Sequence, residues 1–331
     1  MNRILALTAS LILLALGSIQ QAGAQSNLFD GKTITYIVAT KPGGGYDTMG
    51  RLVARFLEKH LPGSRVIVKN VPGAAHLIGA KMINSADADG LTIGTFNTGL
   101  ISWQLTATET DGLDLARMSW IGKAASEKRV LVVSAKSGLN SLDDLRKPDH
   151  KVKMAASGKG AASYQETRML TRAFGLNLEI IPGYEGTEAE LAMLRGEIEA
   201  YVGSESSLKP FIANGNGKII LEIGGQADSP NPQASAHARD DTAKAIIDFI
   251  ATQAQLSRLT AGPPGIPADQ LKALREAYMA ALADPELVAE AEKLELPIAP
   301  ASGDAVAERV RAAFDQPPAT LALLKELLQE E

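Results

Sequence analysis

The chain has 331 residues, with 33 Lys and Arg against 38 Asp and Glu and a formal net charge of −5 at pH 7. With 45% hydrophobic and 21% charged residues, the composition excludes a disordered chain and a protein with many membrane spans. The net negative charge argues against nucleic acid as a partner. The absence of Cys excludes disulfides, thiolate metal sites and Cys nucleophiles. The length predicts two domains or one large α/β unit.

The first 24 residues have the features of a secretory signal. Arg3 gives a positive start, residues 4–19 are almost wholly apolar, and residues 22–24 (Ala-Gly-Ala) form a small-residue cleavage site. The apolar run is short for a membrane anchor. We therefore predict cleavage after Ala24 and export of the remaining chain.

Strands and helices alternate through the rest of the sequence. A strand at 33–39 ends at three glycines and leads into a helix at about 47–61, whose apolar residues fall on one face. Further strands are predicted at 65–69, 91–95, 130–133, 151–155, 200–202 and 218–223. Further helices are predicted at 76–85, 162–174, 187–196, 241–259, 268–283, from 285 after an Asp284 cap, at 304–314 and at 318–330.

This alternation predicts an α/β protein whose sheets are mostly parallel and covered by helices on both faces. The strand–glycine–helix turn occurs twice, near 36–57 and near 151–174. The repetition predicts two similar lobes. Ligands on such sheets bind at the carboxyl ends of the strands, where these turns lie.

The first turn consists of Lys41, Pro42, Gly43, Gly44, Gly45, Tyr46 and Asp47. Its glycines can present bare N–H groups at a helix start, which attract anions, and Lys41 adds a positive charge. The same turn also fits an ordinary strand-to-helix connection, and Asp47 fits an N-cap better than a ligand contact. The turn matches neither the phosphate loop nor the G-x-G-x-x-G dinucleotide motif.

The second turn offers the same chemistry through Ser157, Gly158, Lys159, Gly160, Ala161 and Ser163. Catalytic patterns are missing, because the four His are scattered and neither H-E-x-x-H nor G-x-S-x-G occurs. His76 fits either packing or the lining of a cleft. Glu166 is predicted to lie on a solvated helix face. We expect no catalytic residues, no metal and no cofactor.

Five segments, in order, resemble a known family. They are 34–51 (ITYIVATKPGGGYDTMGR), 70–79 (NVPGAAHLIG), 88–92 (ADGLT), 184–200 (YEGTEAELAMLRGEIEA) and 261–267 (AGPPGIP). Together they resemble the periplasmic solute-binding proteins of tripartite tricarboxylate transporters, the Bug or TctC-like family. The resemblance covers most of the chain after the predicted signal.

The resemblance implies a two-lobed periplasmic binding protein fold, type II-like, with a cleft between the lobes and two crossover strands. It implies lobes at 27–125 with 226–331 and at 126–225, and a hinge at the crossovers. A small mono-, di- or tricarboxylate would lie between the two glycine turns. The implied site further includes Asn97, Thr98, Tyr184, Ser204 and Glu205.

Within that frame Lys41 and Lys159 favour an anion with more than one carboxylate, while Glu205 would accept a hydroxyl or an amine. The expected protein is a non-catalytic, monomeric periplasmic receptor that binds membrane transporter subunits transiently. Two alternatives remain open. One is a sensory module that presents its ligand to a signalling receptor, and the other is an exported enzyme that acts on a carboxylate.

Overall fold

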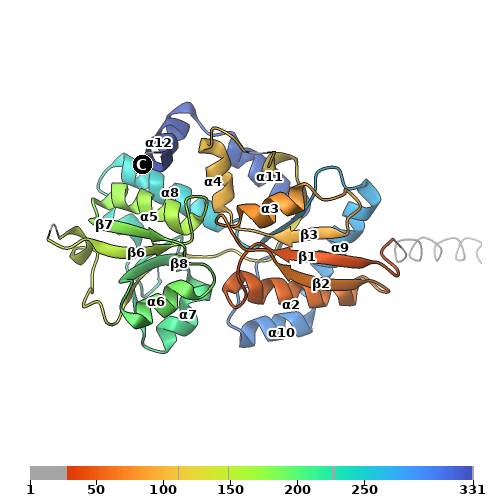
Figure 1. Cartoon of the computed structure of the whole chain (residues 1–331), viewed down its shortest axis with the longest axis horizontal. Coiled ribbons are helices and arrows are strands. Elements are labelled where there is room, and N and C mark those ends of the chain that lie inside the picture. The colour runs from red at the N-terminus through yellow and green to blue at the C-terminus, as the bar shows by residue number, and fades with distance from the viewer. Residues whose placement is uncertain (1–27, 111, 148, 226–227, 330–331) are drawn as a thin grey trace, which may run out of the picture.

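Two α/β lobes lie side by side, each built on one mixed sheet with helices on both faces (Figure 1). The computed structural model describes residues 28–110, 112–147, 149–225 and 228–329. The predicted signal segment, 1–24, lies outside these residues. None of the helices in the described ranges is long and apolar enough to cross a membrane.

The first sheet has six strands in the order β11-β4-β10-β3-β1-β2. Its strands are β1 (Thr33–Val38), β2 (Arg65–Asn70), β3 (Thr92–Thr95), β4 (Ser119–Lys123), β10 (Leu259–Gly262) and β11 (Ala301–Ser302). β1 pairs in parallel with β2 and β3, whereas β10 runs antiparallel to β3 and β4.

The second sheet has five strands in the order β7-β6-β8-β5-β9. Its strands are β5 (Arg129–Ser134), β6 (Val152–Ala156), β7 (Leu178–Pro182), β8 (Ala200–Ser204) and β9 (Gly217–Ile223). β6 is parallel to β7 and β8, and β5 is antiparallel to β8 and β9. Both sheets are therefore mixed rather than mostly parallel. β5 and β10 are the strands at which the chain arrives from the other lobe, and both run antiparallel to their neighbours.

Most of the helices lie where the sequence predicts them, whereas α4 and α7 were not predicted. The helices of the first lobe are α2 (Gly45–His60), α3 (Leu77–Asn84), α4 (Gly99–Thr106), α9 (Ala268–Ala283), α10 (Pro285–Lys293) and α11 (Gly303–Phe314). The others are α5 (Ala162–Phe174), α6 (Glu188–Arg195), α7 (Glu205–Ala213), α8 (Asp241–Ala254) and α12 (Pro318–Gln329). The predicted bounds of α5 and the Asp284 cap of α10 are confirmed.

Two crossover segments connect the lobes and run beside each other. The Ala124 N–H donates to the Arg258 carbonyl (3.1 Å), and the Glu127 N–H donates to the Ala254 carbonyl (3.1 Å). Lys123, which is 4% exposed, donates from Nζ to the Gln255 carbonyl (3.0 Å). The helix predicted at 241–259 therefore stops at Ala254, because the chain must leave it to form the second crossover.

The helices α8 and α12 lie beyond residue 226, and the lobe boundaries themselves stay a prediction. Ile246 and Ile250 of α8 and Leu324 and Leu327 of α12 pack in the core of the second sheet. α12 also contacts α4 of the first lobe and α5 of the second (Figure 1). The C-terminal residues thus serve both lobes, which an amphipathic pattern cannot reveal because it does not say which sheet its apolar face covers.

Candidate functional site

The first glycine turn brings β1 into α2 with its N–H groups at the lobe junction. Gly44 is the N-cap of α2, and no side chain caps that helix. Asp47 lies inside the helix, and its Oδ2 accepts from the Gly43 N–H (3.0 Å) while its Oδ1 accepts from Asn70 Nδ2 (2.9 Å). Asp47 is therefore not the N-cap itself; it holds the turn in shape from within the first helical turn.

The second turn leads from β6 into α5 and meets the first lobe through Asn97. Asn97 Oδ1 accepts from the Gly99 N–H (2.7 Å) and from the Ala162 N–H of α5 (3.0 Å). The Ser157 N–H donates to Ser163 Oγ (3.2 Å). Asn97 therefore connects the lobes at the start of α5 and keeps its amide Nδ2 for other partners.

A third helix, α7, begins at the carboxyl end of β8 with Ser204 as its N-cap. Ser204 Oγ accepts from Nη1 of Arg129 (2.8 Å), the first residue of β5. Arg129 also holds Glu166 of α5 in a forked ion pair, with Nε–Oε1 at 2.8 Å and Nη2–Oε2 at 2.5 Å. The pair is buried, so Glu166 does not lie on a solvated face as predicted.

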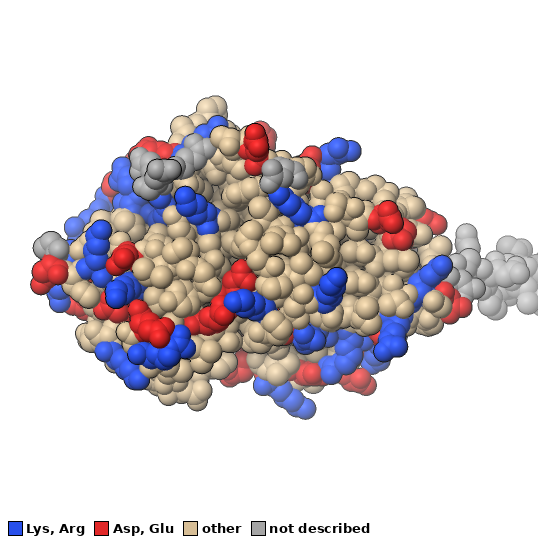
Figure 2. Space-filling model, viewed as in Figure 1, with Lys and Arg blue, Asp and Glu red and all other residues tan. Residues whose placement is uncertain are grey.

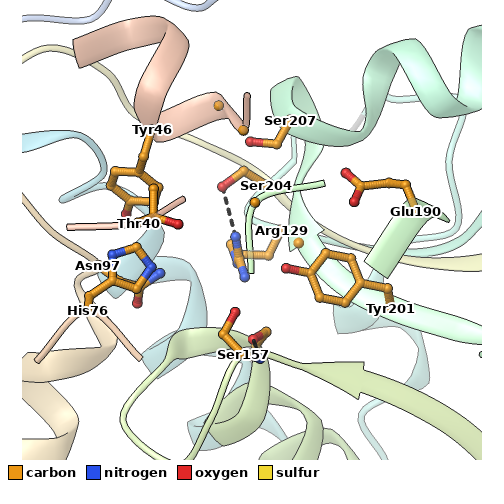
Figure 3. Close-up of a pocket in the computed structure, with 15 residues that line it drawn as sticks. Thr40, Tyr46, His76, Asn97, Arg129, Ser157, Glu190, Tyr201, Ser204 and Ser207 are labelled. Carbon is orange, nitrogen blue, oxygen red and sulfur yellow. Dashed lines mark hydrogen bonds between the residues drawn. The ribbon is translucent and has the colours of Figure 1, made fainter. Parts of the chain in front are cut away.

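These three helix starts surround one cavity of about 70 Å³ between the lobes (Figure 3). Its lining is polar and small, with several hydroxyl groups. The lining residues are Thr40, Gly44, Gly45, Tyr46, His76, Asn97, Arg129, Ser157, Ser163, Gly186, Glu190, Tyr201, Gly203, Ser204 and Ser207. Helix N-termini favour negative charge, so their convergence with Arg129 suits an anion.

Tyr46 forms part of one wall and is held between two basic side chains. The Arg258 guanidinium lies over its ring at 4.2 Å from the centroid, and the His76 ring meets it edge-on at 5.3 Å. Arg258 is fixed in turn by Glu127 (3.1 Å) and Ser207 (3.0 Å). Burial raises the pKa of the Tyr46 hydroxyl, so this group stays protonated.

His76 enters the cavity from a left-handed turn. Ala74, Ala75 and His76 have φ of 47°, 54° and 77°, three consecutive residues other than Gly in a region that costs L-residues energy. His76 is buried, and its Nδ1 has no hydrogen-bond partner within the described part of the chain. Burial lowers the pKa of His76 to about 3, so the imidazole is neutral at physiological pH.

Glu190, from α6, contributes a carboxyl group to the cavity lining. Its Oε2 is buried and has no partner in the ranges that the structure describes. Burial raises the pKa of Glu190 to about 7. Figure 3 shows this carboxyl beside Tyr201 and Ser204, on the second-lobe side of the cavity.

The two lobes touch closely around the cavity. A Cβ on Gly44 would lie 3.0 Å from Gly186 Cα, and a Cβ on Gly99 would lie 2.3 Å from the Ala162 nitrogen. Lys41 Nζ reaches Glu188 Oε1 of the opposite lobe at 2.7 Å. Around this junction and over the rest of the face in Figure 2, acidic and basic side chains are interspersed. The lobes are therefore in a closed arrangement.

The structure brings seven of the predicted site residues into the cavity: Gly44, Gly45, Tyr46, Asn97, Ser157, Ser163 and Ser204. The others lie around it. Lys41 pairs with Glu188, Asp47 braces its turn, and Glu205 pairs with Lys128 (2.9 Å). Those outside the lining are Lys41, Pro42, Gly43, Asp47, Thr98, Gly158, Lys159, Gly160, Ala161, Tyr184 and Glu205. The part of each residue in binding stays a prediction.

Sequence reasoning missed the charged residues of the cavity. Arg129 precedes a buried apolar strand, where a basic residue would ordinarily mark the strand's exposed end. Glu190 lies in the first turn of α6, where the Thr187-Glu188-Ala189-Glu190 pattern is typical of a capping box, although Thr187 makes no side-chain cap. Local signals could not identify either residue, because Arg129 is buried by a partner far along the chain and the place of Glu190 at the cavity depends on how the lobes pack. No cluster of His, Asp and Glu suited to a metal ion occurs among the described residues.

Comparison with known proteins agrees with this fold. The solved structure of the periplasmic binding protein BugD superposes with a TM-score of 0.74 at 21% identity, over 89% of this chain and 97% of BugD. MatC of Rhodopseudomonas palustris, solved with bound malate, superposes with a TM-score of 0.72 at 18% identity, over 89% of this chain and 98% of MatC. The predicted two-lobed periplasmic binding fold is therefore confirmed.

Among curated sequences, BugT of Bordetella pertussis is 28% identical over 205 residues, which are 59% of this chain and 61% of BugT. A protein from the tcbD–tcbE intergenic region of Pseudomonas sp. strain P51 is 24% identical over 205 residues, 61% of each chain. The matches thus span about three fifths of these relatives.

The model of the tripartite tricarboxylate transporter family receptor, TctC, matches residues 49–308. This range contains the cavity-lining residues of the second lobe and the crossovers. The family consists of binding proteins, not enzymes, as the absence of a catalytic pattern predicted. This chain belongs to the TctC, or Bug, family of solute-binding receptors.

Proposed function

We propose that this receptor captures a small organic carboxylate between its lobes in the periplasm and delivers it to the membrane subunits of a tripartite tricarboxylate-type transporter. One observation carries the proposal. Arg129 and the starts of three helices converge on a closed polar cavity, which is an arrangement that binds an anion. The structures of relatives with malate and with adipate support a carboxylate as the ligand.

The guanidinium of Arg129 has donors to spare for a ligand. Its bonds to Glu166 and Ser204 use Nε, Nη2 and Nη1 once each, three of five N–H groups. A carboxylate can accept the remaining N–H groups and those at the start of α2. Because the cavity is enclosed by both lobes, binding would favour the closed arrangement, which the membrane partner would then recognise.

Thermal unfolding with a panel of carboxylates tests the proposal. The protein is first unfolded in guanidinium, dialysed and refolded to remove any carried ligand. A ligand at about 100 times its Kd should add about 2.7 kcal/mol and raise Tm by several degrees. If no mono-, di- or tricarboxylate raises Tm, and mass spectrometry of the denatured protein finds no released acid, the proposal is wrong.

Arg129→Lys provides the specific variant for the same experiment. It keeps the charge but loses the fork geometry, so the ligand-induced rise in Tm should shrink. Lys128→Arg, at a half-buried neighbouring position outside the cavity lining, is the matched control and should retain the full rise.

A further inference from the structure

The cavity has little positive charge available for an anion. Arg129 is the one Lys or Arg among the described residues that line it, and Glu166 already compensates that charge at 2.5 Å. Lys41, which the sequence placed at the ligand, is paired with Glu188 outside the lining. Lys159 is exposed and lines a separate groove. The cavity therefore provides for one carboxylate rather than two or three.

The second lobe instead offers a carboxyl group to the ligand. Among the residues that the structure describes, Glu190 Oε2 is buried at the cavity without a hydrogen-bond partner. A buried polar group without a hydrogen bond costs free energy, and a buried unpaired carboxylate costs more. A donor on the ligand would satisfy this oxygen, whereas a second carboxylate on the ligand would be repelled by it.

The first lobe adds no cation that would reverse this preference. His76 faces the same cavity with Nδ1 unpartnered, but burial keeps its imidazole neutral. Arg258, the other basic group near Tyr46, is 2% exposed and engaged by Glu127 and Ser207. Both lobes thus present neutral or acidic groups away from Arg129.

We propose that the cavity selects a small monocarboxylate whose second polar group is a hydrogen-bond donor, with the carboxylate at Arg129 and the donor at Glu190. The inference rests on the proposed carboxylate-receptor function and narrows it. The cavity volume of about 70 Å³ favours short acids over long ones. Malate and adipate, found in the relatives, each carry a second carboxylate that this cavity would disfavour.

The pH dependence of binding distinguishes an ammonium donor from a hydroxyl donor. The titratable groups that line the cavity with Glu190 are Tyr46, His76, Arg129 and Tyr201. Arg129 stays charged, His76 stays neutral, and burial raises the pKa of Tyr201 to about 12. Glu190 is therefore the group that titrates near neutrality. An ammonium donor should bind more tightly as pH rises from 6 to 8, whereas a hydroxyl donor should show a flat profile or weaker binding.

A matched series of acids tests the inference by isothermal titration calorimetry on the refolded protein. The series is butyrate, 4-hydroxybutyrate, 4-aminobutyrate and succinate, with the corresponding three-carbon acids and their 2-substituted forms. At least one donor-bearing monocarboxylate should bind at least tenfold more tightly than the alkyl acid and the diacid of equal length. Tighter binding of diacids would overturn the inference while leaving the carboxylate receptor intact. Binding of none of the acids, in this series or in the wider panel above, would overturn both.

The variant Glu190→Gln tests whether Glu190 is the group that causes this preference. In this variant, the ratio of the affinity for the donor-bearing acid to the affinity for the diacid should fall at least tenfold. The reason is that the amide no longer repels a carboxylate or attracts an ammonium. Glu197→Gln, at an exposed site just beyond α6, should leave the preference unchanged. Circular dichroism confirms that both variants fold. An unchanged preference in a folded Glu190→Gln protein would overturn the assignment of the donor to Glu190.

Discussion

Arg129 is buried and Glu190 is half-buried, and the structure treats these two charged side chains differently. Arg129 is satisfied by Glu166 and Ser204, so its burial is compensated by charge-assisted hydrogen bonds. Glu190 has an unpartnered oxygen and a raised pKa of about 7. In the free protein Glu190 is therefore a local source of instability, which is typical of a group that acts in binding.

This difference predicts a pH-dependent stability effect at Glu190. A folded-state pKa raised from 4.5 to about 7 means that the folded protein holds this proton more tightly than the unfolded chain. The resulting stabilisation is complete below about pH 4.5 and is lost as pH rises through 7. In ligand-free protein, the free energy of unfolding of Glu190→Gln should therefore rise relative to that of wild type by about 3 kcal/mol as pH increases from 4.5 to 8.

Urea unfolding of both proteins at several pH values measures this gain. Glu197→Gln serves as the control, because its carboxyl is exposed and paired with Arg195. A free-energy difference between wild type and Glu190→Gln that does not change with pH would contradict the prediction.

The strained turn before α3 gives a second prediction at this scale. Ala74 is exposed with φ of 47°, so its methyl group costs backbone energy without packing in the core. Ala74→Gly should stabilise the protein by about 1 kcal/mol. Ala289→Gly, at an exposed position in the middle of α10, should instead destabilise it by about 0.5–1 kcal/mol. Equal effects of the two changes in urea unfolding would argue against strain at Ala74.

At the scale of elements, the site is made by the starts of α2, α5 and α7, each of which follows the carboxyl end of a strand. β1, β6 and β8 end at the lobe junction, so three helix dipoles point toward one cavity. The first and second of these starts correspond to the two glycine turns predicted from the sequence. Their common orientation depends on the sheets, which place strands from two lobes end to end (Figure 1).

Gly99, at the start of α4, tests whether close contact between elements is needed for binding. Its Cβ would lie 2.3 Å from the nitrogen of Ala162 and 2.8 Å from the carbonyl carbon of Ala161, both backbone atoms of the opposite lobe. Gly99→Ala should therefore lower ligand affinity at least tenfold by holding the lobes apart. Thermal unfolding without ligand should change little, because neither lobe's core is altered.

Gly158→Ala is the milder control. Its Cβ would meet only the Ala75 side chain at 3.2 Å, which requires a small shift. Calorimetric affinities of both variants for the same acid give the comparison. Equal affinities of Gly99→Ala and wild type would show that this contact is not part of the bound state.

For the whole molecule, two crossovers and α12 join the lobes while exposed ion pairs connect their edges. Lys41 and Glu188 are 44% and 41% exposed, so solvent screens their pair at 2.7 Å and it should contribute little to closure. Lys209 and Glu295 form a second such pair at 3.1 Å. These contacts adjust the balance between open and closed forms rather than the folding of either lobe.

A charge exchange tests this contact in solution. Glu188→Lys should weaken ligand affinity about two- to fivefold, because two like charges then face each other across the closed cleft. Adding Lys41→Glu should restore the affinity. Small-angle X-ray scattering should show a larger radius of gyration for the single variant than for the exchange variant under the same ligand conditions. Failure of the exchange to restore affinity would place Lys41 and Glu188 apart in the bound protein.

The local sequence determined many of the elements, but it did not predict α4, α7, β4, β7, β10 or β11. The apolar spacing of 162–174 predicted α5, and Asp284 and Pro285 predicted the start of α10. These features follow from hydrogen bonding and side-chain periodicity within a few residues of chain. The part of the two glycine turns in binding stays a prediction. The two-lobed fold was predicted from the five segments that resemble the TctC family and occur in the same order.

The tertiary structure alone decided which charges enter the cavity and which helices serve which lobe. Glu166 lies 37 residues from Arg129, and their burial as a pair depends on α5 packing beside β5. α8 and α12 pack against the second sheet, although residues 226–331 were expected in the first lobe. A charge is buried only when a distant partner compensates its lost hydration, and that partner is set by the packing of the whole chain rather than by neighbouring residues.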